Sequence, residues 1–92
     1  MDKSIKKKVE FYCAYQERCR MEVIQKLKKL KIYGDSIEEY ITHLINNDFL
    51  NEKRFAESYV RGKFNNNDWG KIRIVRELES RNISQVNIEN AL

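Results

Sequence analysis

Apolar residues recur at intervals of three and four along most of the chain, which is the spacing of one face of an α-helix. The first two stripes predict helices over residues 5–16 and 20–31. In the first, Ile5, Val9 and Tyr12 define the apolar face, and Phe11 and Tyr15 are additional candidates for it. The third stripe, over residues 37–45, is the clearest amphipathic pattern in the sequence. The first half of the chain is therefore expected to hold three helices.

Polar residues and a glycine separate these helices. Gly34 is expected to break the chain as a left-handed C-cap or turn residue. The segment that follows contains two overlapping capping-box patterns, Asp35 with Glu38 and Ser36 with Glu39. These patterns predict that the third helix begins with a side-chain cap.

The second half repeats this organisation. After the short apolar pair Phe49-Leu50, Asn51 is expected to cap a fourth helix that ends at a polar loop over residues 65–68. A fifth helix follows, and Asn82 can end it because asparagine tolerates a positive φ. Ser84 is expected to cap a short last helix.

The two halves also match each other at one constant offset of 51 positions. Six apolar residues of the first half each meet an apolar residue of the second half in this way: Met21, Val23, Leu27, Ile32, Ile37 and Ile41 correspond to Ile72, Ile74, Leu78, Ile83, Ile88 and Leu92. Short helices cannot bury their apolar faces alone, so each triplet should form a bundle. The sequence thus predicts an all-α protein of two tandem three-helix units that resemble helix-turn-helix bundles, over residues 1–48 and 49–92.

The apolar pattern of the last helix runs up to Leu92. Two explanations are open: the last helix is short and frayed, or the chain is a fragment of a longer protein.

Charge is unevenly distributed along the chain. The net charge is +4, and residues 1–31 and 53–81 are basic whereas residues 32–52 carry five acids and no Lys or Arg. Basic blocks suit an anionic partner, either nucleic acid or an acidic protein surface, although lysines and arginines that only solvate helices would give the same pattern. No segment is long and apolar enough to span a membrane and no secretion signal is evident, so a cytoplasmic location is expected.

No residue pattern indicates catalysis, a cofactor or a metal. His43 is the single histidine, and with Cys13 and Cys19 it does not supply the ligand spacing of a metal site. No glycine-rich phosphate loop is present, so the chain is not expected to be an enzyme. Trp69, next to Gly70, could stack on a base or pack against a neighbouring helix, and packing is the favoured interpretation.

Exposed cations are the best candidates for partner binding. They are expected on helix flanks away from the apolar stripes, with Lys28 and Lys31 three residues apart on one flank of the second helix. The predicted partner-binding residues are Lys28, Lys31, Arg61, Lys63, Arg73 and Arg76.

Several motifs resemble those of the RecX family, which regulates the RecA recombinase. The most specific is the run from Phe49 to Ala56, followed by Tyr59-Val60, which is similar to the family's Leu-Asp-Asp/Glu-x-x-Phe-Ala-x-x-Tyr/Phe-Val signature. Downstream, the order of Gly70, Ile74, Leu78, Ile83-Ser84, Ile88 and Ala91-Leu92 also fits the family pattern. Upstream, residues 18–27 resemble an Arg-x-Ser-x-x-Glu-Leu-x-x-x-Leu element, with Cys19 where serine is usual.

This resemblance implies an elongated, curved, all-helical regulator that lies in the groove of the RecA–single-stranded DNA filament. Such a regulator modulates filament assembly, ATP hydrolysis and strand exchange, usually negatively, in DNA recombination, repair and the SOS response. Family members usually carry three three-helix repeats, and two are visible here. The alternative function is a tri-helical module that binds single- or double-stranded DNA directly, which a steep salt dependence would reveal.

Overall fold

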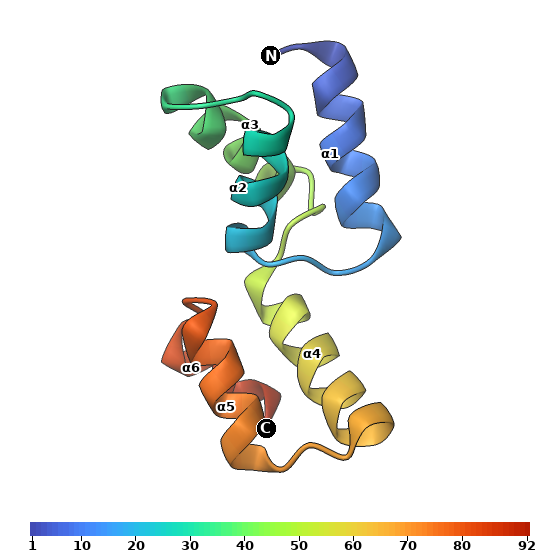
Figure 1. Ribbon diagram of the computed structural model, residues 1–92, viewed down its shortest axis with the longest axis vertical. Coiled ribbons are helices and arrows are strands. Elements are labelled where there is room, and N and C mark those ends of the chain that lie inside the picture. The colour runs from blue at the N-terminus through green and yellow to red at the C-terminus, as the bar shows by residue number, and fades with distance from the viewer. The chain divides into compact units, whose positions relative to one another are not determined.

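The computed structural model describes all residues, Met1–Leu92, and contains helices and no strands, as the apolar spacing predicted. Figure 1 shows the six helices in chain order. Their bounds are α1 Lys3–Tyr15, α2 Arg20–Lys29, α3 Asp35–Asn46, α4 Glu52–Asn67, α5 Lys71–Ser80 and α6 Gln85–Ala91. They form two compact three-helix units, Met1–Asn51 and Glu52–Leu92.

In unit 1, α2 contacts both α1 and α3 around one apolar core. Each helix contributes side chains three or four residues apart, so that they share a face. The buried members of this core are Val9, Cys13, Val23, Leu27, Tyr40, Ile41, Leu44 and Leu50. Phe49 packs against the same core, so the pair Phe49-Leu50 belongs to unit 1. The sequence had placed a boundary after residue 48, whereas the compact units divide after Asn51.

In unit 2, α4 contacts α5 and α6, and α5 contacts α6. The buried side chains are Phe55, Ala56, Ile74, Leu78, Ile83 and Ile88. Helical spacing from Phe55 places Tyr59 on the apolar face of α4, but Tyr59 is only half-buried, and Trp69 and Lys63 lie next to its ring. Burial of such residues supplies the main favourable free energy for folding each unit.

Three helices end with the same left-handed turn. Lys31, Asp48 and Asn82 have φ values of 68°, 61° and 60° and follow α2, α3 and α5. After α2, the amide of Ile32 donates to the carbonyl of Leu27 at 3.0 Å, which is the Schellman pattern. The bond from Ile83 to Leu78 repeats it 51 positions later, at 3.1 Å. The role expected of Asn82 is thereby confirmed.

The expectation for Gly34 is confirmed, and that for the capping boxes is wrong. Gly34 is a turn residue with a positive φ of 67°; it is the N-cap of α3 and not a C-cap, because Lys31 already ends α2. Asp35 and Ser36 lie within the helix and no side chain caps its first turn, so neither predicted capping box forms. Glycine is suited to this position because its φ is costly for other residues.

Two further helix ends were predicted from polar residues, and one prediction was wrong. Asn65, Asn66 and Asn67 do not form a loop but the last turn of α4, and the chain leaves the helix at Asp68 with a φ of 55°. Ser84 caps α6 as expected, because its hydroxyl oxygen accepts a hydrogen bond from the amide of Asn87. No helix in the structure is both long enough and apolar enough to cross a bilayer.

Candidate partner-binding surfaces

Two of the four cations predicted in unit 2, Lys63 and Arg73, gather around one tryptophan. Trp69 lies in the connection between α4 and α5, where its amide donates to the carbonyl of Lys63 at 3.1 Å. The guanidinium carbon of Arg73 lies 3.7 Å from the centre of the indole, and the ammonium of Lys63 lies 4.7 Å from it. Tyr59 meets the indole edge-on at 6.4 Å between ring centroids.

This arrangement holds the two cations in defined positions. An aromatic face attracts a nearby cation through its quadrupole and limits the rotamers that the long side chain samples. Arg73 is exposed and Lys63 is half-buried, so both present charge to solvent from a fixed support. Trp69 therefore packs against its own unit, as favoured from the sequence, and it positions cations as well.

The other predicted cations are less closely associated. Arg76 is exposed on α5 and Arg61 is exposed on α4. In unit 1, Lys28 and Lys31 are both exposed, but only Lys28 lies on α2. The prediction that both occupy one helix flank was wrong, because Lys31 adopts the left-handed turn after the helix.

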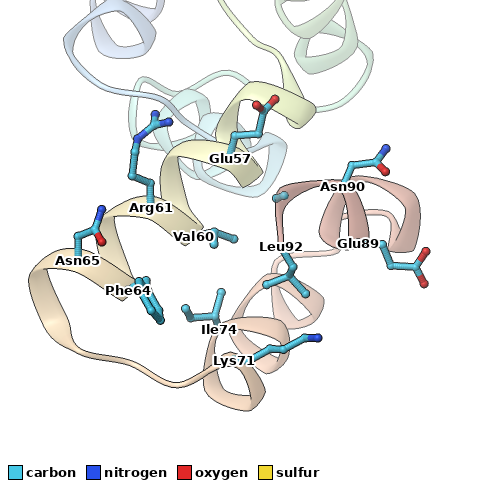
Figure 2. A pocket seen from close by; sticks show the side chains of 11 residues that line it. Glu57, Val60, Arg61, Phe64, Asn65, Lys71, Ile74, Glu89, Asn90 and Leu92 are labelled. Carbon is cyan, nitrogen blue, oxygen red and sulfur yellow. The ribbon is translucent and has the colours of Figure 1, made fainter.

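Arg61 borders an apolar groove of unit 2. Figure 2 shows Val60, Phe64, Ile74 and Leu92 pointing into the space between α4, α5 and α6, while Arg61 points away from them. Phe64 and Leu92 are 63% and 48% exposed. The helical spacing placed Phe64 on an apolar face, but no neighbouring helix covers that end of α4.

A second hollow, in unit 1, was not singled out from the sequence. Its lining consists of cations and aromatic residues: Lys7, Lys8, Phe11, Tyr12, Tyr15, Arg18 and Lys26. Phe11 and Tyr15, the additional candidates for the apolar face of the first helix, are 71% and 73% exposed. That assignment was wrong because Val9 and Cys13 define the buried face of α1, and Phe11 and Tyr15 lie on another side of the helix.

Within this hollow, Arg18 is fixed by Tyr12. Its guanidinium carbon lies 3.7 Å from the centre of the Tyr12 ring, and its Nε donates to the Tyr12 carbonyl oxygen at 3.0 Å. The ammonium of Lys26 lies 5.4 Å from the same ring centre. Burial raises the pKa of the Tyr12 phenol above its ordinary value of 10.0, although Arg18 opposes this shift, so the ring is uncharged near neutral pH.

The remaining polar side chains form structural contacts. His43 and Glu10 are paired at 2.6 Å between Nε2 and Oε2, which joins α3 to α1, and Arg20 pairs with Glu38. Cys19 is 1% exposed at the start of α2 and Cys13 is also buried. No group of three or more His, Cys, Asp or Glu side chains has the arrangement of a metal site.

Glu52 lies within the Phe49–Ala56 motif, but the sequence did not indicate that its carboxylate links two helices. Its Oε2 accepts hydrogen bonds from the Ser84 amide at 3.2 Å and from Nδ2 of Asn87 at 2.6 Å. Burial raises the pKa of this carboxyl, but the hydrogen bonds from Asn87 and Ser84 outweigh burial and the pKa is lowered from its ordinary 4.5. Glu52 thus ties the start of α4 to the start of α6.

The fold and these surfaces define a class: an all-helical protein of three-helix units that displays cations supported by aromatic rings. The family model for the second three-helix domain of RecX matches residues 51–92. The chain is 30% identical over 82 residues to the regulatory protein RecX of Streptococcus uberis, covering 89% of this chain and 32% of that protein. It is 33% identical over 81 residues to RecX of Bacillus cytotoxicus, covering 88% of this chain and 30% of that protein.

Solved structures give the same result. The crystal structure of RecX from Lactobacillus salivarius matches with a TM-score of 0.81 and 40% identity, over 95% of this chain and 56% of that one. A second RecX crystal structure also matches with a TM-score of 0.81, at 25% identity, over 95% of this chain and 46% of that one. The chain is therefore similar to RecX proteins over most of its length, in sequence and in fold. It spans about a third of the length of the curated relatives, which are named regulatory proteins.

Proposed function

We propose that this chain is a non-catalytic regulator that binds the RecA–single-stranded DNA filament and inhibits its recombinase and ATPase activities. Similarity to proteins named regulatory protein RecX supports this function, and the resemblance stated from the sequence motifs supplies RecA as the partner. The site of action is the cytoplasm, in DNA recombination and repair. The repeat ranges 1–48 and 49–92 stay a prediction, because repeats are defined by equivalence of sequence and not by compactness.

The observation that carries the proposed contact surface is the support of Arg73 and Lys63 by Trp69. A cation already held in place loses less conformational entropy on binding than one on a free side chain. Complementary charge mainly speeds association and fixes orientation. The other cations proposed to contact the filament are Lys28, Lys31, Arg61 and Arg76.

The test is a charge reversal on α5, with Arg73→Glu and Arg76→Glu combined. Inhibition of RecA ATPase activity on single-stranded DNA is expected to be lost, with slower capture of the chain by the filament. Because both side chains are exposed, thermal unfolding should change little, by roughly 1 kcal/mol or less in total.

The matched control reverses two exposed lysines outside the proposed surface, Lys29→Glu and Lys53→Glu. This control changes net charge by the same amount and should retain inhibition. Equal loss of inhibition in both variants would mean that net charge alone acts. Full inhibition by the α5 variant would exclude Arg73 and Arg76 from the interface.

A further inference from the structure

We propose that the basic-aromatic hollow of unit 1 binds single-stranded DNA, with Phe11 and Tyr15 stacking on bases and the surrounding cations contacting phosphates. None of its lining residues is among those of the proposed RecA contact, and it does not depend on that function. Its lining residues, Lys7, Lys8, Phe11, Tyr12, Tyr15, Arg18 and Lys26, include no acid.

The first observation is the exposure of two aromatic rings on α1. Phe11 and Tyr15 stand one helical turn apart, with ring centroids 6.2 Å apart and planes tilted by 33°. Neither belongs to the core of unit 1 or to the half-buried side chains packed against it. Large exposed rings gathered together mark interaction sites more often than chance placement. Successive aromatic rings beside a basic groove are the means by which proteins hold unpaired bases without sequence preference.

The second observation is that the positive charge of the hollow is available to a partner. The salt bridges of this unit, Arg20–Glu38 and Glu10–His43, involve none of the four lining cations. Lys7 and Lys8 are exposed. Glu22 lies close enough to act on the Tyr12 phenol, but it is outside the lining, where the four cations outnumber it. Such a cluster would attract a polyanion and release its counterions on binding.

The third observation is the fixed position of Arg18. Its Nε donates a hydrogen bond to the Tyr12 carbonyl, and its guanidinium lies over the Tyr12 ring. The two terminal nitrogens can therefore donate to an incoming anion. A guanidinium offers two parallel donors that fit phosphate oxygens. Stacking rings and a fixed phosphate donor in one hollow favour an unpaired polynucleotide over an acidic peptide, which has no base to stack, and over duplex DNA, whose bases are covered.

The experiment measures binding of the full chain to a fluorescently labelled oligothymidylate by anisotropy, with no recombinase present. The combined variant Phe11→Ala and Tyr15→Ala should bind about a hundredfold more weakly, because each of the two lost base stacks is worth about a factor of ten. The dependence of its affinity on salt should stay like that of the parent, since no phosphate contact is removed. An abasic oligonucleotide of equal length should bind the parent and this variant equally weakly.

Charge is tested separately. Lys7→Gln with Lys8→Gln should reduce the slope of log affinity against log salt, whereas the control Lys29→Gln with Lys53→Gln should not. Tyr33→Ala controls for removal of an exposed tyrosine, because Tyr33 is 60% exposed in the same unit and lies outside the hollow. Far-UV circular dichroism verifies that each variant is folded.

Several outcomes would overturn the site. They are equal affinity of the parent for abasic and normal oligonucleotides, unchanged affinity after loss of both rings, and binding to anionic phospholipid vesicles with none to oligothymidylate. Since RecA is absent, such failures would leave the proposed regulation of the filament intact, and loss of ATPase inhibition in the α5 variant would leave this site intact.

Discussion

The two units share a backbone pattern, but the positions of the ring and the cation are exchanged in their cation–aromatic pairs. In unit 1 the ring of Tyr12 comes from the first helix and the cation, Arg18, from the following connection. In unit 2 the corresponding positions, 51 residues later, hold Lys63 on the helix and Trp69 in the connection. In both units the carbonyl at the helix position accepts a hydrogen bond from the residue in the connection.

The cores differ at the same equivalent positions. Val9, Cys13 and Ile41 are buried in unit 1. Their counterparts at the offset of 51 are Val60, which is half-buried, and Phe64 and Leu92, which are exposed. Unit 1 has a longer third helix, of 12 residues against 7, and α3 adds Leu44 to its core. One backbone pattern can therefore carry a closed core or an open apolar groove. The groove of unit 2 stays open although α6 packs on α4, because Phe64 and Leu92 at the equivalent positions are exposed.

The largest expected effect tests the equivalence of the cores. Leu27→Ala and Leu78→Ala each remove a fully buried side chain at matching positions of α2 and α5. Each should lower the free energy of unfolding by about 2–5 kcal/mol, through lost burial and a residual cavity. Urea denaturation of both variants measures this. A nearly neutral result for either leucine would show that the two positions are not equivalent.

A smaller effect is expected for Glu52→Gln, which breaks a link found in unit 2. Weaker hydrogen bonds to the Ser84 amide and Asn87 should cost about 1 kcal/mol near neutral pH, less than for a fully buried charged pair. The matched control is Glu57→Gln, an exposed carboxyl on the same helix.

The pH dependence of this effect has a defined sign. The pKa of Glu52 is lower in the folded state than its ordinary 4.5, so the unfolded state binds more protons in that region. The stabilisation by Glu52 is present above the ordinary pKa and is lost as pH falls through the folded pKa. Thermal unfolding between neutral and acid pH should show a shallower acid decline in Glu52→Gln than in Glu57→Gln. Identical acid profiles would contradict this role.

The smallest effects compare the two arginines that lie 3.7 Å from an aromatic ring centre, Arg18 over Tyr12 in unit 1 and Arg73 over Trp69 in unit 2. Arg18→Gln and Arg73→Gln should each cost about 0.5–1 kcal/mol from the lost cation–aromatic contact. Arg18→Gln should cost more, because Arg18 also donates a hydrogen bond to Tyr12. Denaturation compares the two, and the fluorescence of Trp69, the single tryptophan, should change only in Arg73→Gln. A change in Trp69 emission on altering Arg18 would contradict this local assignment.

The sequence by itself determined the number and order of the helices, the apolar positions of Leu27 and Leu78 at the same offset, and the turn at Asn82. These features depend on local propensity and on a spacing of three and four residues, which one segment is enough to display. The family motifs could be recognised in the sequence because they consist of helix caps and regularly spaced core positions, which are also local features.

Tertiary structure decided which of several adjacent apolar residues are covered. Phe11 and Tyr12 are neighbours in the sequence, yet Tyr12 packs against the core and Phe11 lies in solvent. Helical spacing defines a face only to within about one residue, and the packed neighbours select the buried side. The aromatic supports of Arg18 and Arg73 were likewise invisible in the sequence, because each depends on the path of a connection. Arg18, after α1, lies over Tyr12, and Trp69, before α5, lies under Arg73.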